Sequence, residues 1–196
     1  MNPAAAFAAF VIIVISASPA CAYDAMEGAG DFYAGLLLNL LVPAHIMTLA
    51  ALALLIAQCP RRERYLVFGF FVAGLVTAIA AIASAFATLY AQLYLLAAAA
   101  LIGFIVASNR RLVFVIAPLA AMAGASLALD SVPQHVSMMA SAIALFGTAA
   151  GAVLIVAAIA YPMADAKSQW LRIGTRIAGS WIAASAILVL SLNLAR

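Results

Sequence analysis

The sequence predicts an all-α membrane protein: a cleavable signal peptide followed by a bundle of six transmembrane helices. The first observation is composition, because 69% of the 196 residues are hydrophobic and only 8% are charged. Soluble domains carry about a quarter charged residues, and a soluble fold of this length has too little interior to hide so much apolar surface. The second observation is that the charges and turn residues are grouped between long apolar segments.

Residues 1–22 have the pattern of a secretory signal peptide. Ala4–Ser16 form a short apolar run, and Ala20-Cys21-Ala22 supplies a cleavage site of small residues. We expect cleavage after Ala22, with residues 23–31 as a short periplasmic segment. Met1-Asn2-Pro3 lacks the usual Lys or Arg, so an uncleaved first span is the alternative.

Residues 32–196 are predicted to form the six-span domain. A bilayer core of about 30 Å needs roughly 20 apolar residues per helix, and the charged and turn residues divide the chain into segments of about that length. The predicted spans are Phe32–Gln58, Tyr65–Phe86, Leu89–Ala107, Leu112–Leu129, Val136–Tyr161 and Ile173–Leu194.

The basic residues predict the orientation, because cytoplasmic loops are enriched in Lys and Arg. With the mature N-terminus outside, all basic residues except Arg196 fall on the cytoplasmic side of the six spans. They are Arg61, Arg62, Arg64, Arg110, Arg111, Lys167, Arg172 and Arg176. We therefore expect a multi-pass protein of the bacterial inner membrane with both mature termini in the periplasm.

Small residues are spaced for close helix contact. Gly147 and Gly151 form a small-x-x-x-small pair, and Gly179, Ser180 and Ala183 give the last span a small face. Close backbone approach through such residues is a main source of helix association in lipid. This pattern predicts a tight bundle, although alanine can also be a tolerated filler.

A buried histidine is the main candidate for a functional site. His45 lies about thirteen residues into the first predicted span, or ~20 Å along a straight helix, and ionisable groups at such depth are often functional. Asn39 precedes it, and Pro43 removes the helical partner of the Asn39 carbonyl, so a break near Pro43 is expected. His45 with Asn39 and Met47 is a candidate cation site, since imidazole suits nickel, copper, zinc and iron. A packing role for His45 is the alternative.

The second histidine suggests a weaker outer site. His135 follows the fourth span in Val132-Pro133-Gln134-His135, close to Asp130. These residues and the acidic N-terminal segment form a candidate capture site, because acidic surfaces concentrate cations. A solvated loop histidine is the alternative.

Several function classes are excluded by what the sequence lacks. It has no P-loop, dinucleotide-binding turn or nucleophile elbow, so we do not expect an enzyme or a permanently bound cofactor. The nine Lys and Arg residues are too scattered for a nucleic-acid track.

Two segments resemble a known family. Asp31-Phe32-Tyr33-Ala34-Gly35-Leu36-Leu37 continuing to Pro43-Ala44-His45 is similar to the first membrane helix of the HupE/UreJ proteins, and Arg172–Ala184 is similar to their last. These hydrogenase- and urease-accessory proteins are regarded as nickel or cobalt permeases. The resemblance implies a signal peptide, six spans and Ni(II) or another divalent transition metal as cargo.

The sequence departs from the family at the metal-binding motif of that family. The family pattern H-x5-D-H, aligned on His45, places Leu38 and Ala44 where a histidine and an aspartate are expected. Two hypotheses follow: a permease or binder of divalent transition metals, most simply nickel, centred on His45, or a non-transporting scaffold. The scaffold would pack as a homo-oligomer or as an accessory subunit of a membrane or metalloenzyme complex.

Overall fold

The computed structural model describes residues 30–81, 90–109, 113–132, 138–164 and 169–195, and all regular structure within them is α-helical. The helices are α3 (Asp31–Leu41), α4 (Pro43–Gln58), α5 (Arg61–Ala81), α6 (Ala91–Ser108), α7 (Val113–Asp130), α8 (Met138–Ala164) and α9 (Gln169–Leu194). The predicted all-α class is confirmed for this part of the chain. The predicted signal peptide and His135 lie outside the described residues.

The helices are long and apolar enough for a multi-pass membrane protein. Five of them, α5 to α9, meet the length and hydropathy of a membrane span, and α3 with α4 supplies a sixth if the bent pair is one span. Each of the six predicted spans therefore corresponds to a helix or to this pair. The second starts earlier than predicted, at Arg61, because Pro60 accepts a helical hydrogen bond from the backbone of Arg64.

The first predicted span is broken sharply between α3 and α4. The two helix axes meet at 76°, and the intervening Val42 is extended, with φ −91° and ψ 114°. Pro43 is the first residue of α4, where its missing N–H has no helical partner to lose. A proline also disfavours helical backbone in the residue before it, which explains the extended Val42 and confirms the predicted break.

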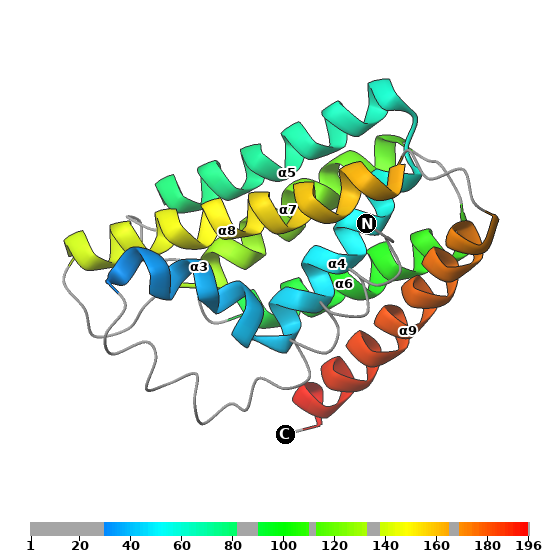
Figure 1. The fold of residues 1–196 in the computed structure, drawn as a ribbon. Helices are drawn as coiled ribbons and strands as arrows, with labels where there is room; N and C mark the ends of the chain where they lie inside the picture. The colour runs from blue at the N-terminus through cyan, green and yellow to red at the C-terminus, as the bar shows by residue number, and fades with distance from the viewer. Residues whose placement is uncertain (1–29, 82–89, 110–112, 133–137, 165–168, 196) are drawn as a thin grey trace.

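Helix α4 forms the centre of the molecule. It packs between α6 and α8, and Figure 1 shows it running through the middle of the bundle. A helix that is apolar on all sides is expected to be buried. Its large aliphatic side chains are almost inaccessible: Leu49, Leu52, Leu55 and Ile56.

Glycines close the three most extensive helix pairs, which are α3 with α8, α5 with α7, and α6 with α9. In each pair, glycines from both helices lie so close to the partner helix that an added Cβ would clash with its backbone or with a neighbouring side chain. These residues are Gly35, Gly147 and Gly151, then Gly74 and Gly124, then Gly103 and Gly179. The predicted roles of Gly147, Gly151 and Gly179 in close packing are confirmed.

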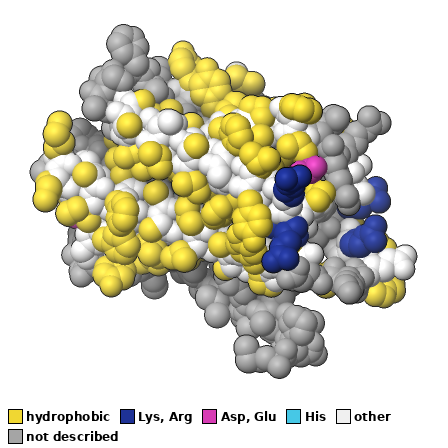
Figure 2. Space-filling view, turned by 90° about the horizontal axis from the view of Figure 1, so that it is seen from above, with side chains coloured by type: hydrophobic (Ala, Val, Ile, Leu, Met, Phe, Trp, Pro, Cys, Tyr) yellow, Lys and Arg dark blue, Asp and Glu magenta, His cyan; other side chains and the backbone are white. Residues whose placement is uncertain are grey.

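The described basic residues share one end of the bundle. Figure 2 shows a largely hydrophobic face with Arg side chains near one end. Arg61, Arg64, Arg172 and Arg176 line one hollow there, together with Asn109. Helix α7 begins shortly after Asn109, so Asp130 at its far end lies about one helix length away, ~26 Å.

Candidate functional site

The candidate site is a contact between the beginning of α4 and the end of α7. His45 Nε2 lies 3.1 Å from Asp130 Oδ2, and the exposed fractions of the two side chains are 1% and 22%. The two residues are 85 positions apart in the sequence. Sequence reasoning assigned His45 to a deep site and Asp130 to a separate outer one. That separation is wrong, because the two side chains are direct partners.

The bend at Val42 explains why the two residues meet. The depth of about 20 Å counted for His45 assumes one straight helix, whereas α3 turns by 76° before α4 begins. His45 is consequently the third residue of a new helix. It lies level with the last residue of α7 instead of halfway along a span.

The two ring nitrogens of His45 have different surroundings. Nε2 is held by the Asp130 carboxylate, whereas Nδ1 is buried without a hydrogen-bond partner. Histidines that bind metal through one nitrogen typically donate the other ring N–H to a carboxylate or carbonyl. The arrangement therefore gives Asp130 the position of an orienting partner and leaves Nδ1 as the atom able to bind a ligand.

Asn39 ties the other side of the bend to α8. Its Nδ2 donates to the carbonyl of Thr148 over 2.8 Å, and the Thr148 hydroxyl donates back to the carbonyl of Gly35 over 3.1 Å. Asn39 Oδ1 is buried without a donor. Asn39 is predicted as a site residue. In the structure its amide nitrogen takes part in helix packing, and its side-chain oxygen has no hydrogen-bond partner.

Thr48 anchors the first turns of α4 to α6. Its hydroxyl donates to the carbonyl of Ala44, one turn earlier, at 2.8 Å, and reaches the carbonyl of Leu95 at 3.4 Å. With the Asp130 contact to α7, this bond fixes the turn that carries His45. Sequence reasoning missed Thr48 and Thr148, whose only signal is that they are hydroxyl residues inside apolar spans.

Met47 does not join His45. Both lie on the continuous helix α4, and side chains two residues apart on a helix do not face each other. The prediction that Met47 shares a site with His45 is therefore not supported by the geometry of α4.

The described residues contain no group of three or more His, Cys, Asp and Glu side chains that could hold a metal ion. A cation at His45 Nδ1 would therefore take its other ligands from amides, backbone carbonyls, water or parts of the chain outside the described residues. His135 is one of those parts, and its predicted capture role with Asp130 stays a prediction.

Comparison with protein-family models, curated proteins and solved structures gave no match for this chain.

Proposed function

We propose that this protein binds a divalent transition metal at His45 and passes it across the membrane. The observation that carries the proposal is the state of the imidazole: one nitrogen is held by Asp130, and the other is buried and unpaired. An unpaired polar atom inside a protein is costly, and a bound cation removes that cost. The resemblance to HupE/UreJ proteins favours Ni(II) as the cargo.

The break between α3 and α4 supports a transport role. Irregular backbone within a membrane protein is tolerated where it is buried in protein or lines a wet cavity, and broken helices commonly form the binding sites of transporters. Val42 leaves the helical conformation three residues before His45. In the proposed mechanism, the ion binds beside this corner, and movement of the short helix α3 relative to α4 exposes it to either side.

The test compares Ni(II) binding and uptake for the wild type, His45→Ala and His45→Gln. The glutamine amide keeps a donor for Asp130 but replaces the imidazole ligand. We expect the wild type to bind Ni(II) by titration in detergent and to raise radiolabelled uptake in cells, and both variants to do neither. Equal uptake by wild type, His45→Ala and empty vector would reject the proposal.

The second candidate is a non-transporting scaffold. It is favoured by the fact that Asp130 already pairs with His45 and that Asn39 already pairs with Thr148, because each contact joins two helices without a bound ligand. In this case the wild type would bind no Ni(II), and His45→Gln would retain wild-type stability. Isolation from native membranes in mild detergent should then recover a second membrane subunit or a metalloenzyme, and recovery of homo-oligomers alone would argue against an accessory subunit.

A further inference from the structure

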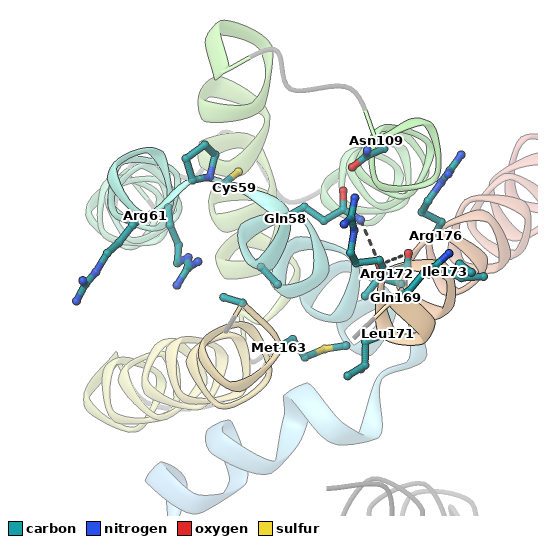
Figure 3. A pocket seen from close by; sticks show the side chains of 15 residues that line it. Gln58, Cys59, Arg61, Asn109, Met163, Gln169, Leu171, Arg172, Ile173 and Arg176 are labelled. Atoms are coloured by element: carbon teal, nitrogen blue, oxygen red, sulfur yellow. Dashed lines mark hydrogen bonds between the residues drawn. The ribbon is translucent and has the colours of Figure 1, made fainter. Parts of the chain in front are cut away.

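A hollow of about 940 Å³ lies at the basic end of the bundle, remote from His45. It lies where α4, α6 and α8 end and where α5 and α9 begin. Figure 3 shows Arg61 on one side of it and Arg172 and Arg176 on the other. The lining of the hollow is therefore assembled from helices that are far apart in the sequence.

The described lining is cationic. Arg61 and Arg64 come from α5, Arg172 and Arg176 come from α9, and none of the described lining residues is acidic. A hollow lined by one sign of charge concentrates ions of the opposite sign. The ligand that fits this lining is an anion.

The arginines are not equally occupied by protein contacts. Arg176 Nε donates to the carbonyl of Ala107 over 3.1 Å and so caps the end of α6. Arg64 Nε, in contrast, is buried without an acceptor. A buried N–H group without an acceptor is unfavourable, and the oxygen of a bound anion would supply the missing acceptor.

The helix ends at the hollow add to this preference. Helix α5 begins at Arg61 and spans 21 residues, and α9 begins at Gln169 and spans 26 residues. The N-terminal end of a helix carries unpaired N–H groups and a partial positive charge, which favour phosphate groups. Two such ends meet here beside the arginines.

Apolar side chains complete the wall. Met163, Leu171 and Ile173 line the hollow, and neighbouring Trp170 has an exposed fraction of 84%. Tryptophans of membrane proteins concentrate at the level of the lipid headgroups. On the α9 side, apolar side chains therefore flank the arginines of the hollow.

We propose that this hollow binds the phosphate headgroup of an anionic phospholipid, with acyl chains lying along the start of α9. Basic hollows between transmembrane helices are suited to headgroups such as that of cardiolipin. Arginines on both sides of the hollow match a headgroup with more than one phosphate. The site is separate from His45 and does not depend on metal binding.

The test measures lipid binding by the purified full-length protein in detergent, using native mass spectrometry and the thermal unfolding midpoint. The probes are cardiolipin and phosphatidylcholine, with inorganic phosphate and glycerol 3-phosphate as soluble probes. The variants are Arg64→Gln and Arg172→Gln. Arg62→Gln is the matched control, because exposed Arg62 lies on the same turn of α5 but does not line the hollow.

We expect cardiolipin to bind more tightly than phosphatidylcholine and to bind about tenfold more weakly to Arg64→Gln and to Arg172→Gln. Arg62→Gln should bind like the wild type. Equal affinity in all four proteins, or equal loss in Arg62→Gln, would overturn the site. Soluble phosphates that bind as tightly as cardiolipin would overturn the lipid source. If Arg64→Gln fails to fold, Arg172→Gln decides, because Arg172 is exposed.

Discussion

The two nitrogens of the His45 ring set the chemistry that this residue can perform. Because Nε2 contacts Asp130, the ring is held in one orientation between α4 and α7. The unpaired Nδ1 costs about 1–3 kcal/mol when it is buried without a partner. The ring is therefore fixed through Nε2, and Nδ1 is the nitrogen that is left to bind a ligand.

If Asp130 orients His45, its replacement should weaken metal binding without abolishing it. For Asp130→Asn we expect the affinity for Ni(II) to fall by about 10- to 100-fold, the usual effect of losing the partner of a metal-binding histidine. Isothermal titration in detergent measures this change. Asp31→Asn, which alters an exposed acid at the start of α3, should leave the affinity unchanged, and a complete loss of binding in Asp130→Asn would instead make Asp130 a direct ligand.

Asn39 should contribute to stability through its bond to Thr148. Hydrogen bonds between helices in membranes contribute about 0.6–2 kcal/mol, so Asn39→Ala should lower the free energy of unfolding in detergent by that amount. Denaturant titration followed by circular dichroism provides the measurement. Gln92→Ala, at an exposed position of α6, is the control, and equal stability of both variants would contradict the contact.

At the level of the helix, packing depends on backbone approach through glycine. Gly35 and Gly147 lie against the backbones of Ala144 and Phe32, respectively. No rotamer change can relieve a clash with backbone, so a larger residue has to push α3 and α8 apart. The cost of such overpacking is about 1–3 kcal/mol.

The effect of replacing a glycine with a larger residue should therefore depend on the position of that glycine in the bundle. Gly147→Val should lower the thermal unfolding midpoint and weaken the α3–α8 contact. Gly69→Val and Gly174→Val should change it little, because an added Cβ meets nothing within 4 Å at either position. Thermal scanning of the three purified variants measures the difference, and similar midpoints for all three would contradict close α3–α8 packing.

The positions of the helices along the chain can be predicted from the sequence. The geometry of the first span can be predicted only in part. Charges and prolines mark where an apolar segment must end, which is why α5 to α9 fall close to the predicted spans. Pro43 marks the break, but the 76° angle depends on where Asn39 and Thr48 bond to α8 and α6. Contacts of that kind are set by tertiary packing.

Across the whole molecule, the basic residues predict which end of the bundle faces the cytoplasm, and the acidic residues predict which end faces the periplasm. Asn109 lines the basic hollow, and Gly30 lies exposed just before α3, within the predicted periplasmic segment. In a protein whose Cys21 and Cys59 are replaced by Ala, Gly30→Cys should react with a membrane-impermeant maleimide in intact spheroplasts. Asn109→Cys should react only after permeabilisation. Labelling of both positions from the same side would contradict the predicted topology.

The candidate site shows where sequence reasoning stops in a membrane bundle. His45 and Asp130 each stood out as polar groups beside apolar segments, but their pairing required the bend at Val42 and the juxtaposition of α4 with the end of α7. On the sequence alone, the arginines of the hollow indicate only the topology. Only the folded arrangement shows that Arg64 and Arg172 line the same space.

The central position of α4 also determines the order in which the protein can be assembled. Its main partners, α6 and α8, are synthesised after it, so α4 enters the membrane before the helices that surround it exist. At 16 residues α4 is short for a span, and it completes one only if α3 enters with it. A chain that ends before α8 would therefore lack one of the two main partners of α4 and leave that side of α4 open to lipid.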